Sequence, residues 1–295
     1  MTPNPRAGIT MVLLAAALWG TTGTANAIAG PSLSALWFGA LRLAVAAVFF
    51  AVYATLTQRG SGVSVPGGRD RSFLLAAGGC MAVYNLAFFA GIRQTGVGAG
   101  TAIALGSGPI WAGILQAWVD RQAPSGRWWV GTLVAVAGGV LLTLGGAGTK
   151  VEVAWTGVLL CLLSGLSYAV YTLLNKRLAH ALPAATITFW AFSVAAVLAL
   201  PVAWAAAGTP VLGAREAAAV AYTGIVTAGV SYLLFSVALR HITPATGVTL
   251  ALTEPAVAFV LAMAFLGERF TLLGVAGFLC VVAGVLAVVR AEIRR

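Results

Sequence analysis

Residues 97–121 read VGAGTAIALGSGPIWAGILQAWVDR, and residues 244–269 read PATGVTLALTEPAVAFVLAMAFLGER. Each segment begins as a helix of small residues, contains a proline, reaches a charged break and is followed by a glycine-rich apolar helix. The two prolines, Pro109 and Pro255, are 146 positions apart. Similarity at a fixed spacing indicates an internal duplication, so we expect the second half of the chain to repeat the fold of the first.

The composition predicts an all-α polytopic membrane protein. Of the 295 residues, 60% are hydrophobic and 8% are charged, whereas soluble domains carry about 25% charged residues. About 20 helical residues cross a hydrocarbon core of roughly 30 Å. Stretches of that length recur throughout the chain, and we interpret the first as a span because it is longer than a signal-peptide core. The predicted spans are 8–29, 33–56, 71–92, 97–119, 127–146, 154–177, 184–207, 215–239, 244–266 and 270–290.

Five spans fall in each half, residues 1–149 and 150–295. Because five is odd, the second half must enter the membrane from the opposite side, which predicts two inverted repeats around a central cavity. With a cytoplasmic N-terminus, twelve Lys and Arg residues lie on the cytoplasmic side and four on the other. Positive residues concentrate in cytoplasmic loops, so we expect both termini in the cytoplasm. The net charge of +10 then reflects topology, and nucleic acid is not an expected partner.

Residues that support catalysis or metal binding are scarce. Cys80, Cys161 and Cys280 lie in separate spans, and both histidines, His180 and His241, fall near the cytoplasmic face. This distribution predicts no disulfide framework, no metal site, no cofactor and no catalytic residue set. We therefore do not expect an enzyme.

Polar and aromatic side chains recur at helical spacing inside several spans. Ser164, Tyr168, Tyr171 and Asn175 follow the spacing i, i+4, i+7, i+11, which places them on one helix face. Hydroxylated residues also mediate helix packing in bilayers, but stripes in several spans favour a shared aromatic cavity. The predicted substrate-binding residues are Trp19, Asn26, Tyr84, Asn85, Ser107, Trp111, Tyr168, Tyr171, Asn175, Trp190, Tyr232 and Thr253.

Two ionisable residues, Arg42 and Glu254, are predicted near the membrane midplane. An uncompensated charge there costs about 2.5–3.5 kcal/mol or more. Three interpretations are open: an Arg42–Glu254 pair that bridges the halves, local capping of backbone groups by each residue, and a protonatable Glu254 that couples transport to protons. The sequence does not choose among them.

The chain resembles the drug/metabolite transporter superfamily, in its EamA-type branch. The resemblance covers the whole chain and depends on Leu18-Trp19-Gly20, Arg42, Thr253-Glu254-Pro255 and Leu266-Gly267-Glu268-Arg269. It implies ten helices in two inverted five-helix repeats, with the fifth and tenth helices at the periphery. Within the branch, the aromatic residues make the chain most similar to bacterial aromatic amino-acid exporters.

The resulting functional prediction is a secondary transporter of the bacterial inner membrane. We expect it to export aromatic or neutral amino acids by alternating access, with facilitated diffusion favoured because few ionisable groups lie at the midplane. The small-molecule substrate and membrane lipids are its expected partners. Candidate flexing points are residues 96–100 and 138–139, with Pro109 and Pro255. Two alternatives remain, a proton-coupled efflux carrier for drugs or other cations and, from another class, a channel.

Overall fold

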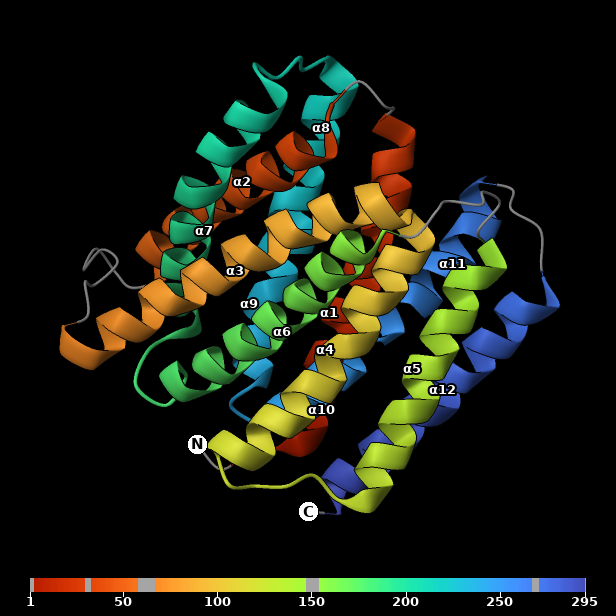
Figure 1. The fold of residues 1–295 in the computed structure, drawn as a ribbon. Coiled ribbons are helices and arrows are strands. Elements are labelled where there is room, and N and C mark those ends of the chain that lie inside the picture. The colour runs from red at the N-terminus through yellow and green to blue at the C-terminus, as the bar shows by residue number, and fades with distance from the viewer. Residues whose placement is uncertain (1–2, 30–32, 58–66, 147–153, 267–270, 295) are drawn as a thin grey trace.

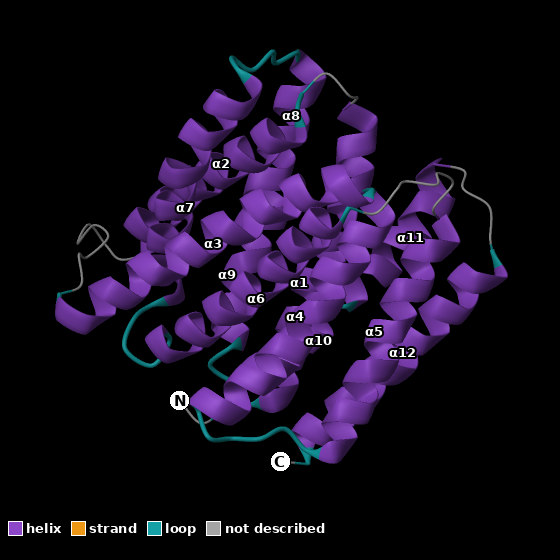
Figure 2. Ribbon diagram, in the orientation of Figure 1, coloured by secondary structure: helices purple, strands orange, loops and turns teal. Residues whose placement is uncertain are grey.

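The computed structural model describes residues 3–29, 33–57, 67–146, 154–266 and 271–294, and every regular element in these ranges is helical (Figures 1 and 2). Ten helical stretches are long and apolar enough to cross a membrane. Large apolar side chains such as Leu56, Trp118 and Leu272 are exposed on the outside of the bundle, as expected for a surface that faces lipid. The predicted all-α polytopic membrane protein is confirmed.

The helices follow the predicted spans closely. Each of the first seven spans is a single helix: α1 (Pro5–Ala29), α2 (Ala35–Thr57), α3 (Gly68–Thr95), α4 (Val97–Val119), α5 (Gly126–Gly146), α6 (Trp155–Leu178) and α7 (Ala184–Ala207). The last three spans comprise α8 (Ala214–Tyr222) with η1 (Thr223–Val230) and α9 (Ser231–Ala238), then α10 (Pro244–Leu250) with α11 (Thr253–Leu266), and finally α12 (Leu272–Ile293).

The helix contacts form two matched sets, which is the pattern of an internal twofold relation. In the first half α1 packs against α9 and α11, and in the second half α6 packs against α3 and α4. Likewise α2 packs against α7 and η1, while α7 packs against α2 and α3. The helices α1 and α6 start from opposite ends of the bundle, and both chain termini lie at one end, the lower end in Figure 1. This architecture is compatible with the predicted inverted repeats.

The helices α5 and α12 form a pair at the edge of the bundle (Figure 1). Their backbones approach closely through glycines: a Cβ atom added at Gly138 would lie 2.7 Å from the carbonyl oxygen of Gly277, and one added at Gly131 would lie 2.9 Å from that of Gly284. Small residues at such contacts increase van der Waals packing between membrane helices. Close packing of the two helices therefore explains why a glycine occupies position 138, which the sequence analysis gave as a candidate flexing point.

Two helix interruptions lie in the second half; the first was not predicted, whereas the second lies beside Pro255, a predicted flexing point. The eighth span contains the π-helix η1, in which the hydroxyl groups of Thr223 and Thr227 donate to carbonyls four residues earlier. The ninth span is broken between α10 and α11, where the amides of Leu252 and Glu254 donate to carbonyls only three residues earlier. Pro255 follows this break, and a proline ring clashes with the carbonyl four residues before it. Both interruptions lie next to the residues of the candidate site.

Candidate functional site

Five of the predicted site residues meet where α1, α3, α6 and α9 approach one another. Trp19 of α1 is edge-on to Tyr232 of α9, with ring centres 5.0 Å apart. The rings of Tyr84 in α3 and Tyr168 in α6 are 5.2 Å apart. Tyr171 lies 6.3 Å from Tyr168 and 6.1 Å from Tyr232. We call these five residues the aromatic cluster, and helices from both halves of the chain contribute to it.

The polar stripe of α6 holds this cluster in place. Ser164 donates a hydrogen bond of 3.0 Å to the carbonyl oxygen of Tyr84, which ties α6 to α3. Asn175 is fully buried; its amide group donates to the Tyr171 hydroxyl at 3.0 Å, and its carbonyl oxygen accepts from Ser236 at 2.8 Å. Because Asn175 bonds both Tyr171 and Ser236, it orients Tyr171 and joins α6 to α9.

Two phenylalanines that were not among the predicted site residues extend the cluster through α7 and α2. Phe192 of α7 lies 4.9 Å from Tyr232, ring centre to ring centre, and Phe50 of α2 lies 5.2 Å from Phe192. Both phenylalanines are almost completely buried. Neither helix carries a stripe of polar residues at helical spacing beside these phenylalanines, so the sequence did not indicate that they point inward.

Arg42 of α2 and Glu254 at the start of α11 flank the cluster. The two side chains lie within electrostatic range of each other, and Tyr84 lies within range of both. No salt bridge joins these two residues in the described chain. A Cβ atom at Gly20 would lie 3.0 Å from the carbonyl oxygen of Glu254, so this glycine lets α1 reach the start of α11.

Buried polar atoms without a hydrogen-bond partner are concentrated among the predicted residues. The described chain contains seven such side-chain atoms, and five belong to Trp19, Arg42, Asn85, Trp111 and Thr253. Leaving a buried donor or acceptor unpaired costs about 1–3 kcal/mol, and native structures rarely leave one unpaired without a reason. These groups are therefore available to a polar ligand or to water.

Some predicted residues lie away from the aromatic cluster. Trp111 is partly buried in α4 and makes no ring contact with the cluster in the described chain. Trp190 packs against Phe189 at 5.6 Å and against a separate apolar group at the start of α7. Thr253 lines an apolar groove of about 400 Å³ between α1, α11 and α12. These three residues thus occupy different surroundings from the tyrosines.

Three other predicted residues remain. Asn85 of α3 is buried, and a Cβ atom added at Gly39 of α2 would lie 2.5 Å from its carbonyl oxygen, so it packs at the contact between those helices. Ser107 donates to the carbonyl oxygen of its own helix at Ala104, 3.2 Å away. The side chain of Asn26 lies outside the described part of the chain.

Polar contacts join the two halves at both ends of the bundle. At the end that holds the termini, Arg177 of α6 forms a salt bridge of 2.8 Å with Asp120, which follows α4. At the opposite end, the indole N–H of Trp37, near the start of α2, donates a hydrogen bond of 2.8 Å to the carbonyl oxygen of Gly208, which follows α7. The aromatic cluster and the two charges lie on helices that run between these contacts.

These features define a polytopic membrane protein with an internal aromatic site flanked by one positive and one negative side chain. The model of the EamA-like transporter family matches residues 6–144 and again residues 155–290. The chain therefore belongs to the EamA-like transporter family and is a transporter of small solutes.

Individual relatives agree with this assignment. The chain is 35% identical over 262 residues to the Bacillus subtilis protein named Uncharacterized transporter YwfM, covering 88% of this chain and 86% of that one. It is 26% identical over 255 residues to the Bacillus subtilis protein named Uncharacterized transporter YdfC, covering 83% and 78% of the two chains. A crystal structure that is 17% identical matches 98% of each chain with a TM-score of 0.84, which establishes the shared fold.

Proposed function

We propose that the protein exports aromatic or neutral amino acids across a bacterial inner membrane, with both termini in the cytoplasm. The observation that carries this proposal is the placement of Arg42 and Glu254 beside the aromatic cluster without a salt bridge between them. An amino acid is a zwitterion, so its carboxylate is complementary to Arg42 and its ammonium group to Glu254. Its side chain is then free to pack on the tyrosine and tryptophan rings.

The division of the site between the halves supports alternating access. Arg42, Trp19 and Tyr84 belong to the first half, whereas Glu254 and Tyr232 belong to the second. When the halves rock against each other, the two charges change their separation, and the site opens toward one side at a time. The amino acid moves down its own gradient, because the site contains no second buried carboxylate in the described chain to bind a coupling ion.

Glu254 also favours a second candidate, a carrier that exports organic cations in exchange for protons. Its carboxylate lies within electrostatic reach of Tyr84 and Tyr168. A carboxylate surrounded by aromatic faces is suited to an organic cation, which gains cation–π attraction as well as charge neutralisation.

Reconstituted liposomes distinguish these functions. Purified protein is tested for saturable uptake and counterflow of phenylalanine, tryptophan and threonine, and separately of a lipophilic cation. The proposal predicts saturable amino-acid counterflow with no dependence on an imposed proton gradient. Uptake of the cation alone, driven by a proton gradient and abolished in Glu254→Gln, would instead support the efflux carrier. Flux without saturation or counterflow would contradict both and indicate a channel.

A further inference from the structure

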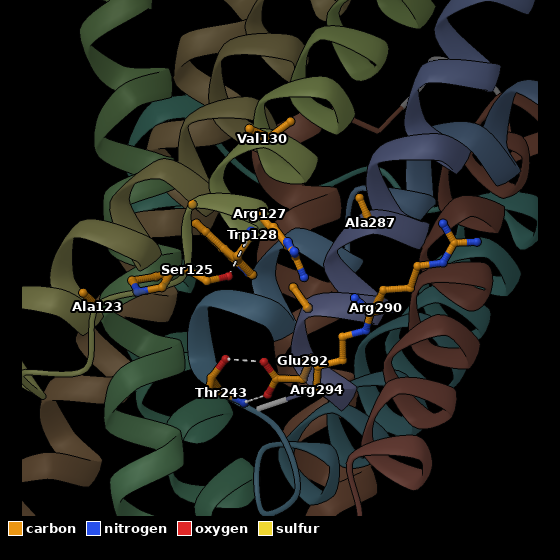
Figure 3. Close-up of a pocket in the computed structure, with 13 residues that line it drawn as sticks. Ala123, Ser125, Arg127, Trp128, Val130, Thr243, Ala287, Arg290, Glu292 and Arg294 are labelled. Carbon is orange, nitrogen blue, oxygen red and sulfur yellow. Dashed lines mark hydrogen bonds between the residues drawn. The ribbon is translucent and has the colours of Figure 1, made fainter.

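A second concave site lies at the end of the bundle that holds the chain termini, far along the helices from the aromatic cluster. It is a pocket of about 950 Å³ between the start of α5, the end of α12 and Thr243 ahead of α10 (Figure 3). Arg127, Arg290 and Arg294 line it, and Glu292 is the single acidic residue in its lining. The pocket is therefore basic.

The acidic residue does not neutralise these arginines. The carboxylate of Glu292 accepts hydrogen bonds from the Thr243 amide at 2.8 Å and from the Thr243 hydroxyl at 3.2 Å (Figure 3). It also accepts a hydrogen bond of 2.7 Å from the Thr246 hydroxyl. These bonds cap the start of α10. No salt bridge to Arg127, Arg290 or Arg294 is present in the described chain. The three guanidinium groups thus retain their capacity to bind an anion.

The position of Arg127 adds a second argument. It is the second residue of α5, and the first turn of this helix contains no acidic residue. The start of a helix carries a partial positive charge, so a cation there is unfavourable and an anion is stabilised. Next to it, Trp128 is buried in the pocket wall, and its indole N–H has no hydrogen-bond partner. An anion in the pocket would neutralise both the helix end and the arginines.

Part of the lining is apolar and belongs to the two membrane-spanning helices. Val130 of α5 and Ala287 and Ala291 of α12 lie in the same wall as the arginines. A pocket lined both by arginines and by apolar residues of membrane-spanning helices matches a ligand that has a phosphate at one end and hydrocarbon at the other. Basic pockets between membrane helices bind anionic lipid head groups in this way.

We propose that this pocket binds a phosphate-bearing anion, and that its occupant is the head group of an anionic phospholipid. Bound there, the lipid would link α5 to α12 and to the start of α10, and so hold the peripheral helix pair against the transporting bundle. This inference does not depend on which solute is transported, since no residue of the pocket belongs to the aromatic cluster.

The test uses the delipidated full-length protein in detergent. Thermal unfolding is followed while phosphatidylglycerol, phosphatidylcholine or inorganic phosphate is titrated in, and lipid retention is counted by native mass spectrometry. We expect phosphatidylglycerol to raise the melting temperature and to be retained, and phosphatidylcholine to do so much less. In Arg127→Gln/Arg290→Gln the apparent affinity for phosphatidylglycerol should fall roughly 25-fold, because each of the two arginines contributes about fivefold to the attraction of an anionic lipid.

A matched control removes the same charge at the same end of the bundle. Arg69 and Arg71, at the start of α3, are exposed and outside the pocket, and Arg69→Gln/Arg71→Gln should keep the wild-type response. If inorganic phosphate raised the melting temperature as much as phosphatidylglycerol does, the pocket would still bind an anion, but its occupant would be a soluble phosphate compound and not a lipid. The proposal would be overturned if both lipids raised the melting temperature equally while phosphate had no effect. It would also be overturned if the two double variants lost equal affinity for phosphatidylglycerol.

Discussion

Arg42 and Glu254 form no salt bridge with each other in the described chain, so the contribution of each residue to binding the amino and carboxyl groups of the substrate can be tested separately. Glu254→Gln should reduce phenylalanine transport efficiency about 10- to 100-fold, because a charge-assisted hydrogen bond contributes about 1.5–3 kcal/mol. The same variant should leave inhibition by phenylpropionate, which lacks the ammonium group, unchanged. Arg42→Gln should show the reverse selectivity, losing phenylalanine but not phenylalaninamide. Equal losses for all three compounds would contradict separate recognition of the two charges.

Tyr232 contacts Trp19, Tyr171 and Phe192, so its ring is central to any preference for aromatic substrates. Replacing it with leucine keeps an apolar side chain but removes the aromatic face. We expect Tyr232→Leu to reduce the ratio of tryptophan to threonine transport about two- to tenfold, since aromatic pairs contribute about 0.5–1.5 kcal/mol beyond burial. Competition assays in liposomes measure this ratio. An unchanged ratio would show that the cluster does not contact the substrate side chain.

The sequence predicted part of this site because helical spacing identifies shared faces. The stripe Ser164, Tyr168, Tyr171 and Asn175 does face α3 and α9. What spacing cannot show is whether a polar group is already satisfied, and Asn175 is bonded on both sides of its amide. It also cannot orient a lone aromatic residue in an apolar helix. For that reason Trp190 was included with the tyrosines whereas Phe192, two residues later, was not.

At the level of helices, hydropathy placed all ten spans but could not detect interruptions within them. The π-helix η1 and the break before Thr253 both occur inside continuous apolar stretches. Threonine hydroxyls bond the backbone in η1, and Pro255 follows the break before Thr253. Both lie in the second half, and the corresponding helices α3 and α4 of the first half are continuous. The two repeats are therefore unequal next to the site.

The contact between α5 and α12 offers a prediction with an adjacent control. A Cβ atom at Gly138 would lie 2.7 Å from the Gly277 carbonyl oxygen, whereas one at Gly139 would have nothing within 4 Å. Gly138→Ala should destabilise the protein by about 1–3 kcal/mol because the backbones must separate. Gly139→Ala should be neutral or stabilising, since alanine favours a helix over glycine by about 1 kcal/mol. Thermal unfolding in detergent compares the two; equal melting temperatures would contradict the packing argument.

For the whole molecule, alternating access requires the halves to separate at one end during each cycle. Asp120 and Arg177 join the halves where the termini lie. In a background without Cys80, Cys161 and Cys280, the pair Asp120→Cys/Arg177→Cys can be joined by a short bifunctional thiol reagent. We expect cross-linking to abolish counterflow and each single cysteine variant to be insensitive to the reagent. Full counterflow in cross-linked protein would exclude opening at that end.

We propose that one site between the two halves binds a zwitterionic amino acid and is exposed to each side of the membrane in turn. Phenylalanine counterflow tests it most directly: liposomes loaded with unlabelled phenylalanine are diluted into a trace of labelled phenylalanine. We expect a transient, saturable accumulation of label that is inhibited by tryptophan and lost in Arg42→Gln and Glu254→Gln. Equilibration of the label at the same rate in loaded and empty liposomes, or in wild type and both variants, would contradict it.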